Sequence, residues 1–253
     1  MNGLATPLLI SSLATGTIIV AGSNHWLTAW IGLELNTLAI LPLLTKSHTP
    51  RTTEAAIKYF LTQAVASATL LLASSMNAFE AGQWNIMQLT TQPALTMLTL
   101  ALMMKLGLAP LHAWLPEVMQ GTTTTMALLL ATWQKLAPFA MLYMLAHTLH
   151  TPTMLLLALL SALLGGWAGL NQTQLRKLMA FSSIAHLGWV IAALTLNKDL
   201  ATLTLALYIS MTTTMFSTMM ATNMKSLKDT TTTWHTLPTT TLITLLTLVS
   251  LAG

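Results

Sequence analysis

The chain contains no cysteine and very little charge. Only 6% of its 253 residues are Asp, Glu, Lys or Arg, and 54% are hydrophobic, whereas soluble domains carry about 25% charged residues. The absence of cysteine excludes disulfides, thiolate metal sites, cysteine-ligated iron–sulfur clusters and cysteine nucleophiles. The shortage of charge excludes a soluble domain of this size, because so few charged residues cannot cover its surface. We therefore expect a membrane protein.

Acidic residues are scarcer than basic ones. The chain has 10 Lys and Arg against 6 Asp and Glu, for a formal charge of +4. In a soluble protein this excess would suggest nucleic-acid binding, but here the basic residues fall in short loops between apolar segments. Their placement indicates orientation in a bilayer, so no nucleic-acid partner is expected. Phosphate-loop, dinucleotide and nucleophile-elbow motifs are also lacking.

Long apolar segments make up most of the sequence. Dividing the sequence at polar, Pro and Gly clusters predicts about nine segments of spanning or nearly spanning length. They are 4–20, 25–45, 53–75, 94–108, 122–147, 152–170, 173–195, 200–222 and 238–253. Backbone polar groups in lipid must be paired within helices, so the predicted fold class is all-α, a polytopic transmembrane helix bundle.

No loop is long enough to fold outside the membrane; the longest predicted loop is 76–93. We therefore expect a single membrane domain over 1–253. The last segment, "TTTLITLLTLVSLAG", stays apolar to Gly253, which favours a fragment of a longer chain.

The basic residues are distributed unequally between the two sides of the predicted bundle. Alternating the nine segments places seven Lys and Arg on the side of the N-terminus and one, Lys198, on the other. The seven are Lys46, Arg51, Lys58, Arg176, Lys177, Lys225 and Lys228. By the positive-inside rule the N-terminal side is the cytoplasm-like, negative side.

Three ionisable residues fall inside predicted spans: Glu34, Lys105 and Lys135. Each costs about 2.5–3.5 kcal/mol at a helix centre, and such residues usually face a cavity or each other and mark ion or proton routes. A nearby carboxylate favours a charged lysine whereas burial disfavours it. A lysine held between these effects exchanges its proton near neutral pH, so the three residues are the candidate proton-transfer groups.

Other interpretations of the three charges remain open. Lys105 lies five residues before Pro110 and is able to snorkel to the N-terminal side. Lys135 lies in the middle of its segment, where snorkelling is harder. Glu34 is able to act as a structural partner that neutralises one lysine without a transport role.

Prolines follow both lysines. Pro110 and Pro116 flank "LHAWL" and predict a broken helix near 105–116, whose free backbone groups can line a wet cavity as in secondary transporters. Pro138 lies three residues after Lys135, and its ring meets the carbonyl of Gln134. This predicts a kink beside that lysine.

Two of the seven histidines are placed where they can join a proton route. His112 lies in the predicted interruption and His186 lies within a span; the alternative for His186 is a hydrogen-bonded packing residue. His147 and His150 share a helix face as haem ligands do, but each haem would need a partner on another helix. No histidine pair has metal-ligand spacing with a carboxylate, so no metal site is expected.

Several stretches resemble a known family. "KLGLAPLHAWLPEVMQG" resembles the hallmark stretch of the antiporter-like proton-translocating membrane subunits of respiratory complex I. "GGWAGLNQTQLRKLMAFSSIAHLGW" is similar to their second signature, and "SNHWLTAWIGLELNTLAILPLL" and "EAAIKYFLTQAVASA" match too. The similarity runs along essentially the whole chain and is greatest to the shortened mitochondrial form found in animals.

The resemblance implies roles for particular residues. It implies that Glu34 and Lys105 form a pair near mid-membrane and that Lys135 belongs to a central hydrated axis. Lys58 and Lys177 match secondary positions near the face of the N-terminal side. The resemblance also implies two inverted repeats, the first complete to about residue 147 and the second, from about 152 to 253, truncated.

The resemblance further implies a subunit of NADH:ubiquinone reductase with no cofactor of its own. NADH, FMN, iron–sulfur clusters and ubiquinone are expected in other subunits. The implied partners are other membrane-arm subunits and lipid, cardiolipin included, rather than a second copy of the chain. The implied location is the mitochondrial inner membrane with the N-terminus on the matrix side. The rival functions are a stand-alone cation–proton antiporter subunit and a purely structural subunit.

Overall fold

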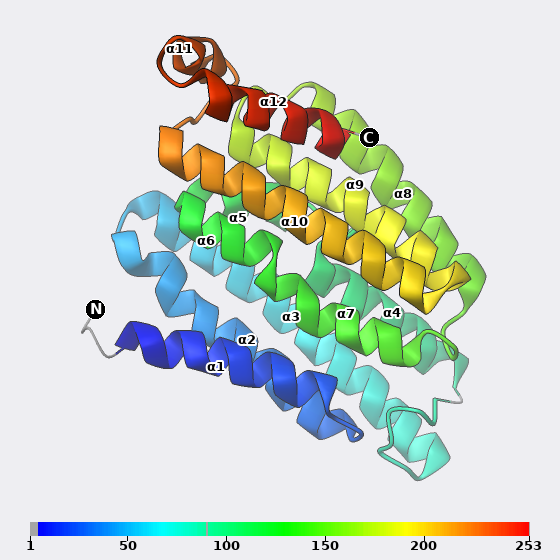
Figure 1. Cartoon of the computed structure of the whole chain (residues 1–253). Helices are drawn as coiled ribbons and strands as arrows, with labels where there is room; N and C mark the ends of the chain where they lie inside the picture. Colours follow the sequence, from blue (N-terminus) through cyan, green and yellow to red (C-terminus); the bar gives the residue numbers. More distant parts are fainter. Residues whose placement is uncertain (1–4, 90, 253) are drawn as a thin grey trace. The chain divides into compact units, whose positions relative to one another are not determined.

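The computed structural model describes residues 5–89 and 91–252, without the side chain of Ala252. In this part of the chain the regular elements are all helices, and no strand is present (Figure 1). The helices are α1 (Ala5–Ala21), α2 (Trp26–Leu44), the 3-10 helix η1 (Thr45–Ser47), α3 (Pro50–Ala81), α4 (Gln92–Leu106), α5 (Trp114–Gly121), α6 (Thr124–Ala131), α7 (Trp133–Leu145), α8 (Thr151–Leu170), α9 (Leu175–Leu196), α10 (Lys198–Thr222), α11 (Asp229–Thr236) and α12 (Pro238–Ala252). The outer ends of the first and last predicted spans, Leu4 and Gly253, lie outside the described residues.

Six helical segments are long and apolar enough to cross a membrane. They are Trp26–Ser47, Pro50–Ala81, Thr124–Leu145, Thr151–Leu170, Leu175–Leu196 and Lys198–Thr222. The prediction of an all-helical chain with several membrane spans is therefore confirmed. α1 and α12 are apolar but shorter than the length required to span.

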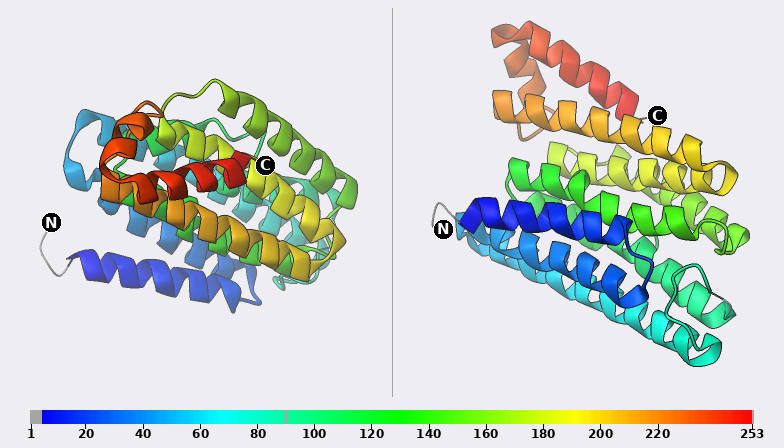
Figure 2. Two further views of the ribbon diagram at one scale, coloured as in Figure 1. Left: turned by 45° about the horizontal axis from the view of Figure 1, so that its top comes forward. Right: turned by 60° about the horizontal axis from the view of Figure 1, so that its bottom comes forward.

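The chain divides into two compact units that interleave along the sequence. Unit 1 contains Met1–Gly107 and Gln134–Met154, and unit 2 contains Leu108–Trp133 and Leu155–Gly253, as far as each is described. In unit 1, α2 packs against both α1 and α3, and α3 packs against α4 (Figures 1 and 2).

Close helix approach in unit 1 depends on glycine. A Cβ added to Gly16 of α1 would lie 2.9 Å from the carbonyl oxygen of Gly32 in α2, and a Cβ on Gly32 would lie 2.9 Å from the carbonyl of Gly16. The two backbones therefore meet where neither residue has a side chain. Small residues at helix crossings are the usual means of close packing in membranes.

In unit 2, α10 packs against α6, α9 and α12 (Figure 2), and α9 also packs against α5. Glycine again sets the approach of two helices. A Cβ on Gly188 of α9 would lie 2.7 Å from the carbonyl oxygen of Ala158 in α8, and one on Gly165 of α8 would lie 2.6 Å from the amide nitrogen of Ala185.

The third predicted span was too short. The sequence predicts 53–75, but α3 runs from Pro50 to Ala81. Thr49 forms a capping box at its start, Pro50 occupies the first helical position, where proline is tolerated, and Gly82 ends it with φ 66°. The polar residues that suggested a loop from 76 lie on the helix, and buried Asn77 donates a hydrogen bond to the carbonyl of Gln88 at 2.9 Å.

The predicted span 122–147 is two helices, α6 and α7, separated at Thr132. The eight-residue helices α5 and α11 were not predicted, because two turns are too short to produce a clear periodic pattern.

Candidate proton-transfer site

Lys105 is buried near the end of α4. Its side chain is 4% exposed, and its Nζ makes no hydrogen bond to any described residue. Side-chain snorkelling to the surface is therefore not what this lysine does. The helix ends one residue later because Gly107 adopts a left-handed conformation with φ 77° and donates its N–H to the carbonyl oxygens of Met103 and Met104.

The carbonyl of Leu106, directly after Lys105, is available to another partner. In a continuing helix it would accept a hydrogen bond from the residue four positions later, but that residue is Pro110, which has no N–H. The ammonium of Lys135 donates a hydrogen bond to this carbonyl oxygen instead. A carbonyl released at the end of α4 is thus used by the second buried lysine.

Lys135 lies in the first turn of α7 and is 1% exposed. Pro138 lies inside α7, which continues through it, whereas the helical segment is interrupted earlier, at Thr132. Proline at the sixth position of α7 removes only a bond to Gln134, which lies in the first turn. The interruption therefore precedes Lys135 rather than following it.

Pro110 and Pro116, which together predicted the break near 105–116, occupy different kinds of position in the structure. Pro110 lies in the non-helical segment after Gly107, which separates α4 from α5 as the predicted break near 105–116 required. Pro116 lies inside the first turn of α5. Proline is accepted there because the first N–H groups of a helix have no helical partner.

Glu34 lies in the middle of α2 and is half-buried. Its Oε2 accepts a hydrogen bond from Thr37 Oγ1 at 2.7 Å, and the same hydroxyl is 2.8 Å from the backbone carbonyl of Glu34. Glu34 and Lys105 form no direct ion pair; the charge of Glu34 acts on Lys105 through space. The same charge acts on the phenol of Tyr59 in α3.

Further polar side chains are buried in unit 1, on α2 and α3. Tyr59, Gln63 and Ser67 follow one another at four-residue intervals on α3, and all three are buried. Both polar side-chain atoms of Asn36 in α2 are buried without a hydrogen-bond partner among the described residues. The same holds for Nε2 of Gln63. Sequence reasoning missed these uncharged residues, although the four-residue spacing on α3 was visible.

Glu34, Lys105 and Lys135 all belong to unit 1. Lys135 bonds to the carbonyl next to Lys105, and the charge of Glu34 acts on Lys105. Lys58 also belongs to unit 1, but it is 40% exposed and forms an ion pair with Glu54 at 2.6 Å. An ion pair at (i, i+4) on a helix surface is sufficient to explain Lys58.

The remaining candidates, His112, His186 and Lys177, belong to unit 2. His112 lies in the segment before α5, and its buried Nδ1 has no hydrogen-bond partner among the described residues. His186 Nε2 lies 3.1 Å from the carbonyl oxygen of Leu251, and its ring packs 5.9 Å from that of Tyr208. Lys177 is half-buried in the first turn of α9. Within the described residues no group of three His, Asp or Glu side chains is placed to hold a metal ion.

Comparison with known proteins places this geometry in a family. Residues 23–253 match the transmembrane family described as NADH:quinone oxidoreductase/Mrp antiporter. Proteins named NADH-ubiquinone oxidoreductase chain 2 from Xenopus laevis and Latimeria chalumnae are 51% and 52% identical over all 253 residues, and the chain covers 73% of each. The chain belongs to the NADH-ubiquinone oxidoreductase chain 2 family.

Solved structures agree with this family and its antiporter-like fold. A chain of respiratory complex I from Thermus thermophilus superposes with a TM-score of 0.89 at 30% identity, over 99% of this chain and 60% of that one. A chain of the Mrp complex from Dietzia sp. superposes with a TM-score of 0.77 at 14% identity, over 84% of this chain and 44% of that one. The second likeness shows the fold alone. The chain thus spans about three quarters of its curated relatives and three fifths of the Thermus chain.

Proposed function

We propose that this chain carries part of the proton translocation of NADH:ubiquinone oxidoreductase, respiratory complex I, and that Glu34, Lys105 and Lys135 are its proton-transfer groups. It is a membrane subunit of this enzyme, since its relatives across the full chain are chain 2 of NADH-ubiquinone oxidoreductase. Its antiporter-like fold fits a role in moving protons through the membrane.

The observation that carries the proposal is the placement of the three charges. They come from α2, α4 and α7, three helices far apart in the sequence, and they lie in the same compact unit. Lys135 reaches the backbone directly after Lys105 through the Leu106 carbonyl. Buried charges that converge in this way in a membrane protein mark functional routes rather than stabilising pairs.

The charge of Glu34 acts on Lys105 through space, and a nearby carboxylate favours the charged form of a lysine. A proton that arrives at the carboxylate removes this support, and the lysine then holds its own proton less strongly. Lys105 has no hydrogen bond to replace the lost interaction. Protonation of Glu34 therefore promotes release from Lys105, which is the directional step that a proton relay needs.

The uncharged polar groups nearby supply the hydrogen bonds along which a proton travels. Tyr59 and Gln63 are buried on α3, which packs against the helices that carry Glu34 and Lys105. Unpaired amide atoms in such a place hold water readily, because a buried polar group without a partner is unfavourable. His112, His186, Lys58 and Lys177 remain secondary candidates for the same route.

The proposal extends to membrane placement. α1, α4 and α12 cross the bilayer together with the six longer segments, giving nine spans in one membrane domain. That domain is built from an inverted repeat ending near residue 147 and a second one over about 152–253. The membrane is the mitochondrial inner membrane, with the N-terminus in the matrix. The excess of basic residues on the N-terminal side supports this orientation.

The proposal also covers partners and cofactors. The other membrane-arm subunits and membrane lipid, cardiolipin included, are the partners, and the chain does not pair with a second copy of itself. NADH, FMN, iron–sulfur clusters and ubiquinone are proposed to bind to other subunits, and the sequence has no cysteine that could ligate an iron–sulfur cluster.

The test is Lys135→Met in the assembled complex. Methionine keeps the length and apolar stem of the side chain but cannot carry a proton. We expect normal assembly and NADH oxidation with fewer protons translocated per NADH, measured in reconstituted vesicles. Lys46→Met, at an exposed lysine of unit 1, is the matched control. An assembled Lys135→Met complex with the proton ratio of the parent would refute the role of Lys135.

A purely structural role is the second candidate, because the charge of Glu34 acts on Lys105 and could serve only to balance it within the bundle. Exchanging the two charges, Glu34→Lys with Lys105→Glu, separates the two functions. A structural pair tolerates the exchange and leaves proton translocation unchanged. A relay loses translocation, since the acid and the base then act in the reverse order, while assembly measured on native gels remains.

A further inference from the structure

Two turns of unit 2 that are distant in the sequence are joined by backbone hydrogen bonds. The N–H of Leu175, at the start of α9, donates to the carbonyl of Lys225 at 3.2 Å, and the N–H of Leu227 donates to the carbonyl of Thr173 at 3.1 Å. The turn between α8 and α9 is thereby fixed against the turn between α10 and α11.

This pairing gathers positive charge. Arg176 and Lys177 follow the first turn, and Lys225 and Lys228 lie in the second. The one carboxylate in these two turns belongs to Asp229, whose oxygens accept hydrogen bonds from the N–H of Lys225 at 2.7 Å and from Ser226. The two turns therefore carry four cations and one carboxylate, and that carboxylate is already hydrogen-bonded within its own turn.

A polar cavity of about 240 Å³ opens at this cluster. Arg176 and Lys225 contribute its two cations, and Asn223 adds an amide. Arg176 is held in place because its guanidinium donates to the carbonyl of Thr122. The full lining is Thr123, Thr124, Arg176, Met219, Asn223, Met224 and Lys225. Two cations, one of them fixed, with neighbouring hydroxyl and amide donors suit a phosphate group.

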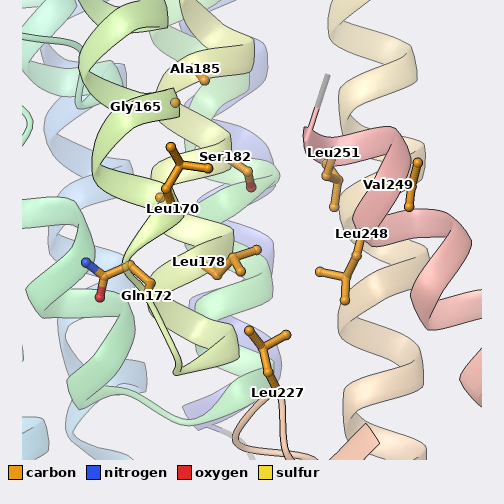
Figure 3. Close-up of a pocket in the computed structure, with 12 residues that line it drawn as sticks. Gly165, Leu170, Gln172, Leu178, Ser182, Ala185, Leu227, Leu248, Val249 and Leu251 are labelled. Atoms are coloured by element: carbon orange, nitrogen blue, oxygen red, sulfur yellow. The ribbon is translucent and has the colours of Figure 1, made fainter.

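The same second turn also borders a larger apolar groove of about 380 Å³, to which Leu227 contributes. Figure 3 shows Leu170 and Leu178 on one side of this groove and Leu248 and Leu251 of α12 on the other. Gly166 of α8 lines it as well, and a Cβ added to Gly166 would meet nothing within 4 Å. The groove is therefore open beside α8.

We propose that unit 2 binds one anionic phospholipid, with its phosphate between Arg176 and Lys225 and an acyl chain in the groove beside Gly166. A polar, cationic cavity and an apolar groove that share one turn match the two halves of such a lipid. Basic pockets between membrane helices recognise anionic headgroups. The charge complementarity favours a phospholipid over an apolar polypeptide segment, which would leave the cations unused.

This lipid site depends on the proposed function only because both require that the chain lies in a bilayer. The experiment measures lipid retention and not proton translocation. A negative result would therefore leave the proposed proton route of unit 1 unaffected. The full chain in mild detergent is incubated with phosphatidylglycerol, with phosphatidylcholine of the same acyl chains, or with glycerol 3-phosphate. Native mass spectrometry then counts the retained molecules, and circular dichroism verifies that each variant keeps its helices.

We expect phosphatidylglycerol to be retained about tenfold better than phosphatidylcholine. Lys225→Gln lowers retention of phosphatidylglycerol about fivefold, whereas Lys46→Gln, at an exposed lysine of unit 1, does not. Gly166→Leu fills the groove and lowers retention of both lipids. Gly22→Leu, at a glycine where a Cβ has ordinary space, leaves retention unchanged.

Three results would overturn the proposal. Equal retention of the two lipids removes the role of the cations. Binding of glycerol 3-phosphate as strong as that of phosphatidylglycerol assigns the cavity to soluble phosphate esters. Retention by this chain but not by the full-length Xenopus laevis relative assigns the groove to polypeptide that the longer relatives carry.

Discussion

The two units treat charge in opposite ways. In unit 1, Glu34, Lys105 and Lys135 lie inside apolar helices, and both lysines are almost fully buried. In unit 2, the charged residues of the described part lie in turns or near helix ends. Of the eight buried side-chain atoms without a hydrogen-bond partner among the described residues, seven belong to unit 1.

This difference in buried polar groups indicates which unit carries the proposed proton transfer. Buried polar groups without partners are unfavourable, so they persist where chemistry requires them. Both units pack helices closely at glycines, at Gly16 and Gly32 in unit 1 and at Gly165 and Gly188 in unit 2, but the cations of unit 2 lie in turns or near helix ends. We therefore expect substitutions at the charges of unit 1 to alter activity more than stability, and substitutions at the packed glycines of unit 2 to do the reverse.

The largest expected effect is that of Lys105→Met. The share of proton translocation that this chain carries should fall about a hundredfold, the typical contribution of a positioned acid–base group. Thermal stability should be unchanged or higher, because a buried ammonium without a hydrogen bond is replaced by an apolar side chain. The check is vesicle acidification together with thermal unfolding. A Lys105→Met complex that is less stable but still translocates protons at the parent rate would make the role of this lysine structural.

The next effect belongs to unit 2. Gly188→Ala forces a Cβ to within 2.7 Å of the Ala158 carbonyl, and we expect a loss of about 2 kcal/mol in unfolding free energy. Gly166→Ala is the matched control, since its Cβ meets open space and alanine favours the helix by about 1 kcal/mol. Unfolding of both variants in mixed micelles measures the difference. Equal stability of the two variants would show that the close approach of the two backbones at Gly188 does not limit what unit 2 tolerates.

A smaller effect is expected from Thr37→Val. The substitution removes the hydroxyl that donates to Glu34 Oε2 while keeping the shape of the side chain. The charged carboxylate loses about 1 kcal/mol of support, so the rate of proton translocation should change about fivefold. Thr37→Ser should restore the parent rate, because serine brings back the donor. A serine variant as altered as the valine one would indicate packing rather than hydrogen bonding.

The smallest effect concerns Asp229, outside the spans. Hydrogen bonds from the backbone N–H of Lys225, and then from Ser226, hold the pKa of this carboxyl below its usual value. A lowered pKa in the folded state stabilises the turn above the unfolded value, about pH 4, and this support disappears as the pH falls through the folded value. Hydrogen exchange at the amides of Lys225 and Ser226, compared with that of an unprotected amide at the same pH, should become faster below about pH 4. In Asp229→Asn it should already be fast at neutral pH.

The sequence predicted more of the fold than of the site. Apolar runs identified the helices because the bilayer requires both length and apolar character. Charges inside those runs identified Glu34, Lys105 and Lys135 as candidates. The extension of α3 to Ala81 was missed, because its last turns carry polar residues that are satisfied or buried by neighbours. The short helices α5 and α11 had too few turns for a periodic signal.

Composition and pattern by themselves determined that this is an all-helical membrane chain with three ionisable residues inside its apolar segments, because few sequences tolerate such residues without a use for them. Tertiary structure alone decided their relation. That Lys135 reaches the Leu106 carbonyl, that Pro110 leaves this carbonyl without a helical donor, and that Glu34 acts on Lys105 without touching it all depend on how α2, α4 and α7 pack. Contacts between distant segments follow from packing, which no local pattern encodes.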